Sequence, residues 1–170
     1  MRLTAHGGHP QTSHPTMPRH WLMKSEPAEC SIDDLAGAAQ QTLPWTGVRN
    51  YQARNFMRDD MQAGDGVLYY HSSCTEPGIA GLAQIAGAAT SDSTQFDAAS
   101  PYFDPKSKTY GSRWLQIDVR LVQKTRLLGL KEMRAQNSLQ SMRVLQNGNR
   151  LSITPVSDVE WLEVLRLLGC

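Results

Sequence analysis

A strict alternation of apolar and polar side chains constrains the fold of this chain more than any other feature. Every second residue from 115 to 121 is apolar, namely Leu115, Ile117, Val119 and Leu121. The residues between them are Gln116, Asp118 and Arg120. Successive side chains of a β-strand point to opposite faces of its sheet. This period of two therefore predicts a strand with one face on a core.

Shorter apolar segments, bounded by turn formers, add further strands. They cover residues 20–24, 67–71, 79–85 and 151–154. Helices are expected at residues 31–35, 50–61, 130–136, 138–146 and from residue 157 onward. Residues 91–112 are polar and read as a long loop, and loops of that length inside a compact domain are usually functional or disordered. Because strands and helices intermingle without regular βαβ alternation, we expect an α+β fold with a small curved or barrel-like sheet.

Capping residues mark where three of the helices begin. Ser31 and Asn50 are good N-caps, and Ser157 is followed three residues later by Glu160, which is a capping box. In the helix that starts at Asn50, the residues expected to face the core are Ala53, Phe56 and Met57. The last helix carries one apolar stripe, formed by Trp161, Val164, Leu165 and Leu168. Such a stripe usually faces the core, and a partner-binding role is the alternative.

Composition excludes several classes of protein. The 170 residues suffice for one domain with a sizeable core. No apolar run approaches the roughly 18 residues that a membrane span needs, so we expect no membrane association. Lys and Arg number 17 against 16 Asp and Glu, for a net charge of +1. That balance excludes a protein held to nucleic acid mainly by counterion release, so any such role needs a local patch or pocket.

The cysteines indicate a reducing compartment. Cys30, Cys74 and Cys170 are odd in number and have no CxxC spacing, so they predict neither a disulfide framework nor a zinc cluster. We expect a cytoplasmic protein with free thiols, without a metal or a cofactor.

The N-terminal segment has little to bury. It is rich in turn formers and histidine, so we expect residues 1–19 to form a disordered tail and residues 20–170 to form the domain. Met17 is an alternative start of the natural product. A metal role for His6, His9 and His14 is a less favoured alternative.

The common catalytic signatures are missing from the sequence. It contains no GxxxxGK[ST], HExxH or GxSxG motif. His71, at the end of a predicted strand, is either a general base or a hydrogen-bonded strand-end histidine, and the second role is the more common. No local motif assembles a nucleophile, a base and an orienting group.

Two tryptophans fall outside the apolar patterns. Trp45 sits in a glycine-containing turn, and Trp114 has the parity of the polar residues on the alternating strand. Basic residues that accompany them are Lys24, Arg49, Arg54, Lys106 and Arg113. Such a set suits a planar ligand, because stacking on an aromatic ring is worth about 1–3 kcal/mol per base. The alternative is that both tryptophans only cover a small barrel.

Several motifs together resemble the EVE domain family. They include Trp21-Leu-Met-Lys-Ser-Glu-Pro27, Ser31-Ile-Asp-Asp-Leu35, Trp45-Thr-Gly-Val-Arg-Asn-Tyr-Gln-Ala-Arg-Asn-Phe56, Tyr70-His-Ser-Ser73, Tyr102-Phe-Asp-Pro-Lys-Ser107 and Gly148-Asn-Arg-Leu-Ser152. The match runs from about His20 to the C-terminus, and residues 45–56 are its most specific part. It implies a PUA-like fold, which is a small mixed β-barrel with surrounding helices.

The resemblance also implies a function and a site. Members of this family are thought to bind modified bases in DNA or RNA, without established catalysis. Carried over by motif, the aromatic-lined pocket would use Lys24, Ser25, Glu26, Trp45, Val48, Arg49, Asn50, Tyr51, His71, Ser72 and Trp114. We expect a local positive surface at Arg49, Arg54, Lys106 and Arg113, with phosphate contacts from the last three.

Two functions from different classes therefore stay open, and a small-molecule or protein-binding module is a third, less favoured alternative. The favoured one is non-catalytic binding of a modified nucleobase in DNA or RNA. The other is an enzyme that acts on a nucleotide or modified base, for example by hydrolysis as in ASCH proteins of the same fold family. Its acid and base candidates are Lys24, Glu26 and His71. The sequence does not identify the base.

Overall fold

The computed structural model describes residues 17–170. Residues 1–16 of the expected tail, with their three histidines, lie outside the described residues. Arg19 is already held in place, because its backbone N–H donates to Asp65 at 2.9 Å and its guanidinium pairs with Asp60 at 2.8 Å. Tertiary contacts are thus present one residue before the expected boundary at residue 20.

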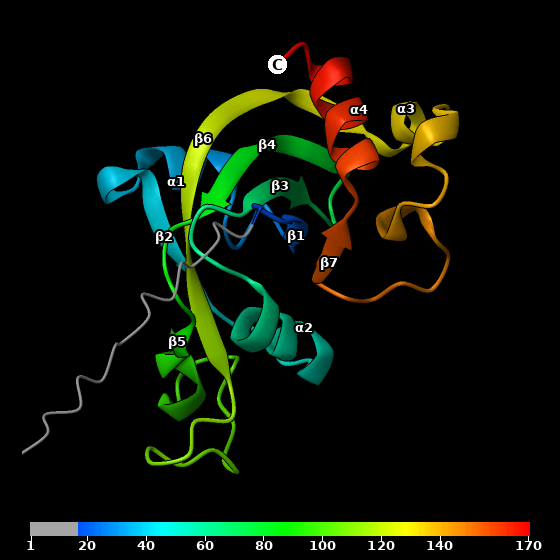
Figure 1. The fold of residues 1–170 in the computed structure, drawn as a ribbon. Helices are drawn as coiled ribbons and strands as arrows, with labels where there is room; N and C mark the ends of the chain where they lie inside the picture. Colours follow the sequence, from blue (N-terminus) through cyan, green and yellow to red (C-terminus); the bar gives the residue numbers. More distant parts are fainter. Residues whose placement is uncertain (1–16) are drawn as a thin grey trace, which may run out of the picture.

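One mixed sheet of seven strands organises the domain (Figure 1). Its strands are β1 (His20–Ser25), β2 (Thr42–Trp45), β3 (Gly66–His71), β4 (Gly78–Ile85), β5 (Thr90–Ser91), β6 (Leu115–Gly129) and β7 (Ile153–Val156). The order is β2-β6-β4-β3-β1-β7, and β5 pairs with β6. β1 and β3 run parallel, so their carboxyl ends meet at one edge of the sheet.

The sheet is curved but does not close into a barrel. β2 and β7 are the two ends of the strand order, and the pairings of residues 17–170 do not join them. β6 arcs along the sheet from β5 to the end of the strand next to α3 (Figure 1). Its register against β4 shifts twice, and such irregularities bend a strand and increase its twist. The α+β class is confirmed, whereas the expected barrel is an open, curved sheet.

Four α-helices and several short turns connect the strands. The helices are α1 (Ile32–Gly37), α2 (Tyr51–Asn55), α3 (Leu130–Arg134) and α4 (Asp158–Leu168). A π-helical turn at Phe56–Asp60 continues α2, and 3₁₀ turns lie at Ala39–Gln41, Ser93–Phe96, Asn137–Leu139 and Arg143–Leu145. The predicted caps are confirmed: Ser31 and Ser157 form capping boxes, and Asn50 accepts from a backbone N–H of α2.

Some boundaries differ from those predicted. The alternating strand continues to Gly129, and the last strand begins two residues later than expected, at Ile153. The two helices expected at 130–136 and 138–146 are one short helix followed by 3₁₀ turns. β2 was missed, because Pro44 and the glycine-containing turn after it favoured a loop.

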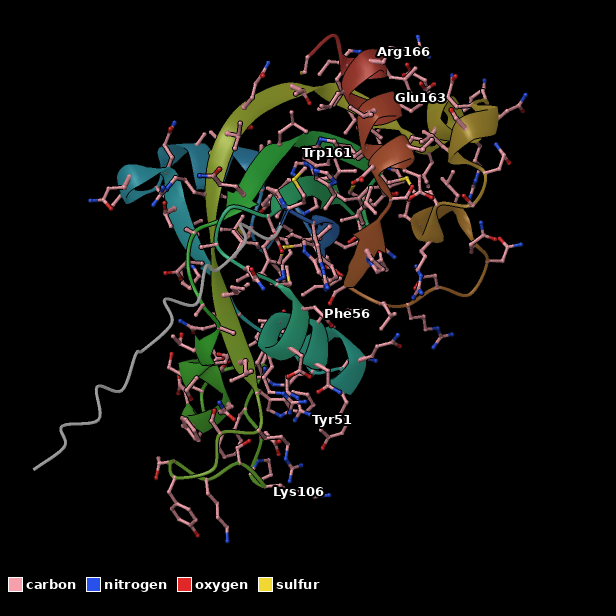
Figure 2. All side chains as sticks on the ribbon, in the orientation of Figure 1. Tyr51, Phe56, Lys106, Trp161, Glu163 and Arg166 are labelled. Atoms are coloured by element: carbon pink, nitrogen blue, oxygen red, sulfur yellow. The ribbon has the colours of Figure 1, made fainter. Side chains whose placement is uncertain are left out.

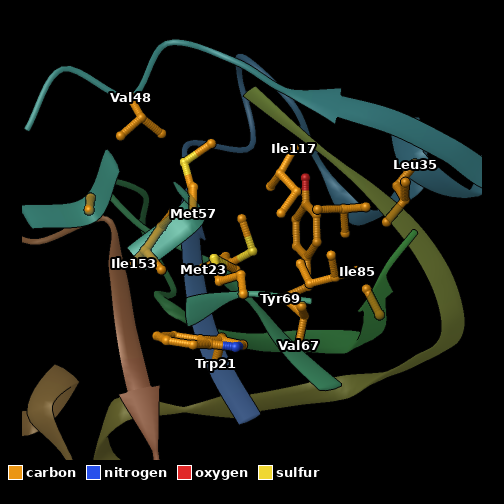
Figure 3. Close-up of a cluster of buried hydrophobic side chains, with 14 of the residues drawn as sticks. Trp21, Met23, Leu35, Val48, Met57, Val67, Tyr69, Ile85, Ile117 and Ile153 are labelled. Carbon is orange, nitrogen blue, oxygen red and sulfur yellow. The ribbon is translucent and has the colours of Figure 1, made fainter. Parts of the chain in front are cut away.

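Both faces of the sheet are buried. On β1, Trp21 and Met23 belong to one hydrophobic cluster and Leu22 to a second one on the opposite face. The first cluster also contains Tyr69 (Figure 3). The apolar stripe of α4 packs on the second cluster, and its Val164 is fully buried. The core role expected for this stripe is confirmed.

No helix of residues 17–170 has the length and apolar character to cross a membrane.

Candidate functional site

A cavity of about 650 Å³ opens where the parallel strands β1 and β3 end. Its walls come from the end of β1 and the segment after it, from α1, and from β2 and the turn that follows. The end of β3, Val119 of β6 and residues 101–102 and 150–152 complete them. Volumes of 300–1,000 Å³ are typical of small-molecule sites. Of the predicted pocket residues, six line it: Lys24, Ser25, Glu26, Trp45, Val48 and Ser72.

Trp45 supplies an aromatic wall. It is the last residue of β2, it is half-buried, and its ring meets the ring of Tyr69 edge-on with 5.3 Å between centroids. Tyr69 is buried, and its hydroxyl donates to the carbonyl of Cys30 at 2.8 Å. Tyr69 thus fixes the edge of the Trp45 ring against the core. In the described residues, the indole N–H of Trp45 has no hydrogen-bond acceptor.

The inner surface of the cavity is apolar. Leu35 of α1, Val48 and Val119 of β6 line it, and their exposed fractions are 1%, 3% and 0%. We call these three residues the apolar floor. An apolar floor beneath an aromatic wall can accept a flat ring and a methyl group, because neither needs a hydrogen bond there.

The opening of the cavity is polar. Lys24, Ser25 and Glu26 follow one another at the end of β1, and Ser72 lies at the end of β3. The Ser25 hydroxyl donates to the carbonyl of Cys30 at 2.8 Å, which holds the segment after β1 in place. The Glu26 carboxylate has no hydrogen-bond or ion-pair partner among residues 17–170. Its acceptor atoms are available to a ligand.

Tyr102 is a wall residue that the pocket prediction missed. Its ring lies against the backbone of Gly47, where an added Cβ would come within 2.8 Å of the ring. Its hydroxyl donates to the two carboxylate oxygens of Glu29 at 2.8 and 2.9 Å. Burial and this hydrogen bond raise the pKa of Tyr102 to about 12. The signal was present, because Tyr102 begins one of the matching motifs, but it lies in a long loop whose position the sequence does not give.

Arg49 holds the walls and does not line the cavity. Its Nε and Nη2 donate to the carbonyl of Tyr102 at 2.9 and 2.6 Å, and its Nη1 donates to Asp92 at 2.9 Å. Asp92 is fully buried and also accepts from the backbone N–H of Gly47. Arg49 therefore joins the turn after Trp45 to the loop that carries Tyr102.

The charge of Asp92 matters for this connection. Burial alone would raise the pKa of its carboxyl, but hydrogen bonds from Thr94, Arg49 and Gly47 outweigh burial and the pKa is lowered. The carboxylate is thus the stable form, and it is matched to the guanidinium.

The other predicted aromatic residues stack beside the cavity instead of lining it. Tyr51 stacks on Trp114 with centroids 4.9 Å apart, and Asn50 caps α2. Trp114 is only 6% exposed, lies outside both core clusters, and donates from Nε1 to Asp104 at 2.7 Å. The expectation that Trp114 closes the pocket is wrong in this structure, because its ring is enclosed by its neighbours.

His71 has the structural role that was the alternative to catalysis. At the end of β3, its Nε2 accepts the backbone N–H of Ile32 at 3.0 Å. Burial is the largest of the effects that lower its pKa, so the neutral ring is favoured. His71 does not line the cavity, and its accepting nitrogen fixes the start of α1.

The predicted phosphate contacts do not converge on the cavity. Arg54 donates to the carbonyl of Arg113 at 3.1 Å and lies over the Tyr51 ring, while Arg113 is 3.6 Å from Asp104. Lys106 is exposed in the loop below the sheet (Figure 2). Two of the four expected cations, Arg49 and Arg113, are thus paired with carboxylates, which reduces the positive surface they were expected to form.

Comparison with known proteins identifies the family of this chain. The family model of the EVE domain matches residues 19–167. The chain belongs to the EVE domain family. The human thymocyte nuclear protein 1 is 42% identical in an alignment of 166 positions that covers 87% of this chain and 73% of that protein.

Solved structures of EVE relatives share the fold. A protein from Pseudomonas syringae is 44% identical, with a TM-score of 0.83 over 87% of this chain and 98% of that one. Human THYN1 in complex with DNA that contains 5-methylcytosine is 41% identical, with a TM-score of 0.84 over 89% of this chain and 98% of that one.

Proposed function

We propose that this EVE domain binds a modified nucleobase in DNA, without reacting with it, in the cavity at the ends of β1 and β3. The observation that carries the proposal is the combination of the Trp45 ring, the apolar floor and a polar opening in one cavity. A base that leaves the helix or lies in a single strand can stack on an aromatic ring while its edge meets hydrogen-bonding groups. The 5-methylcytosine DNA complex of human THYN1 supports DNA as the polymer.

The cavity suits a methylated pyrimidine in particular. The C5 methyl group of such a base would lie on the apolar floor, where Leu35, Val48 and Val119 are buried. The exocyclic amine of cytosine is a donor, and a carboxylate accepts from it. Glu26 lines the same cavity and offers that carboxylate. Methyl contact and amine recognition would together distinguish 5-methylcytosine from thymine and from cytosine.

The test compares oligonucleotides that differ in one base. Fluorescence anisotropy is measured with DNA that carries a single 5-methylcytosine, cytosine or thymine, as duplex and as single strand. We expect 5-methylcytosine to bind about fourfold more tightly than cytosine, because burying one methyl group is worth about 0.8 kcal/mol. It should also bind more tightly than thymine, which has the methyl group but lacks the exocyclic amine that a carboxylate accepts from. Equal affinity for the three bases would contradict the proposal.

Additional experiments test RNA binding, a reaction on the base and the cellular location. The same oligonucleotides made as RNA test whether RNA also binds, and mass spectrometry of the recovered DNA tests for a reaction. An unchanged mass after long incubation is expected, and a changed base would favour the enzymatic alternative. The cytoplasmic location inferred from free cysteines stays a prediction, to be checked by imaging a tagged chain.

A further inference from the structure

Two basic side chains, Lys24 and Arg150, line the cavity. Lys24 is near the end of β1, and Arg150 belongs to the segment just before β7. The backbone joins these two segments, since the N–H of Lys24 donates to the carbonyl of Ser152 at 2.8 Å. The Lys24 ammonium also reaches the carbonyl of Asn149, at 3.4 Å. The two basic side chains therefore start from neighbouring positions.

Neither cation has a carboxylate partner within the described chain. Across residues 17–170, no carboxylate forms an ion pair with Lys24 or Arg150. Arg150 is exposed, and its guanidinium makes no hydrogen bond within the described chain. By contrast, Arg49 and Arg113 have carboxylate partners.

The environment of Lys24 is unfavourable to an unmatched charge. The side chain is half-buried, and burial lowers the pKa of its ammonium. An anion bound beside it would offset that cost, because an opposite charge within a few ångströms favours the charged form. The other charges on the cavity are the carboxylates of Glu26 and Glu29, and Glu29 accepts from Tyr102.

We propose that Lys24 and Arg150 form a phosphate subsite on the cavity wall, so that the cavity takes a base together with the phosphate of its own nucleotide. This inference rests on the proposed function and names the unit that is recognised. Arg binds phosphate through two parallel N–H groups, and Lys supplies a point charge. The subsite replaces Arg54, Lys106 and Arg113 as the main phosphate contact at the cavity.

The test compares two small ligands that differ by one phosphate. NMR titrations measure the affinity of 5-methyl-2′-deoxycytidine and of its 5′-monophosphate for the wild-type chain, Lys24→Gln and Arg150→Gln. The wild type should bind the monophosphate more tightly than the nucleoside. Each variant should lose about tenfold or more for the monophosphate, as expected for hydrogen bonds to a charged group, and should retain its affinity for the nucleoside.

Matched controls are available on α3. Lys131→Gln and Arg134→Gln remove the same charges from exposed positions that do not line the cavity, and neither should change the affinity for either ligand. Inorganic phosphate should compete with the monophosphate and not with the nucleoside.

The outcomes separate this inference from the proposed function. Nucleoside binding with no gain from the phosphate, or with no loss in Arg150→Gln and Lys24→Gln, would overturn the subsite and leave the base-binding cavity standing. If the wild type bound neither the nucleoside nor the monophosphate nor DNA, both the subsite and the proposed function would be overturned. An equal loss in the α3 controls would show a general effect of charge and would also overturn the subsite.

Discussion

At the residue scale, hydrogen-bond partners separate side chains that can contact a ligand from those that hold the cavity in shape. Lys24 and Glu26 line the cavity and have no carboxylate or cation partner in the described chain. Arg49 and His71 are also polar side chains, but their nitrogens form hydrogen bonds within the protein. Mutating the first pair should change binding, and mutating the second pair should change folding.

The pH dependence of stability tests the role given to His71. Its lowered pKa means that the native state resists a proton that the unfolded chain accepts near pH 6.5. The contribution of His71 is therefore present above that pH and is lost as the pH falls below it. Urea unfolding at pH 7.5 and 5.5 should show a smaller pH-dependent loss in His71→Gln than in the wild type. An identical loss in both would contradict this role.

At the element scale, the cavity depends on how a short turn and a long loop are fastened to each other. Asp92 receives the Arg49 guanidinium and the backbone N–H of Gly47, and Arg49 in turn holds the carbonyl of Tyr102. Trp45 and Tyr102, on opposite sides of this connection, both line the cavity. The turn and the loop should therefore move together.

Asp92→Asn tests this connection. The substitution keeps the shape and removes the charge that matches Arg49, so the free energy of unfolding should fall by about 1–3 kcal/mol at neutral pH. The pKa of Asp92 is lower in the folded protein than in the unfolded chain. Its contribution to the free energy of unfolding is therefore present above the pKa of the unfolded chain and is lost as the pH falls through the lower pKa of the folded protein. Wild type and variant should thus converge in stability at low pH. A constant difference down to pH 2 would argue against the role of this charge.

Ser157→Ala tests an element that does not line the cavity. Ser157 caps α4 in a capping box with Glu160, and loss of such a cap costs about 0.5–2 kcal/mol. Thermal unfolding should show that loss, whereas affinity for DNA should stay at the wild-type value. A parallel loss of affinity at a temperature where the variant is fully folded would show that α4 takes part in binding.

At the scale of the whole molecule, the sequence predicts features set by neighbouring residues but not the pairing of segments that are far apart in the chain. Caps at Ser31 and Ser157 and the alternation in β6 act within a few residues, so the sequence predicts them. The parallel pairing of β1 with β3, and the covering of both faces of the sheet, join distant segments and leave no local pattern.

The same limit explains the errors at the site. The partners of Arg49 lie 43 and 53 residues away along the chain, so a basic residue inside a specific motif was interpreted as a ligand contact. Trp114 was expected at the pocket because its parity is polar, but α2 supplies Tyr51 to cover it. Trp45 and Val48 line the cavity, as the resemblance of residues 45–56 to the EVE family led us to expect.

The near-neutral charge of the molecule limits how strongly it can bind DNA without the cavity. With a net charge of +1, non-specific attraction to DNA is weak, so affinity depends on the cavity. Trp45→Ala removes the aromatic wall, and Leu162→Ala on the exposed face of α4, where Leu162 is 64% exposed, removes apolar surface elsewhere.

The most direct measurement is the affinity of these two variants for DNA with one 5-methylcytosine, after circular dichroism has shown that both are folded. We expect Trp45→Ala to bind about 5- to 150-fold more weakly, as for the loss of one stacking contact, and Leu162→Ala to bind like the wild type. Unchanged affinity in folded Trp45→Ala would show that the base does not stack on Trp45 in this cavity.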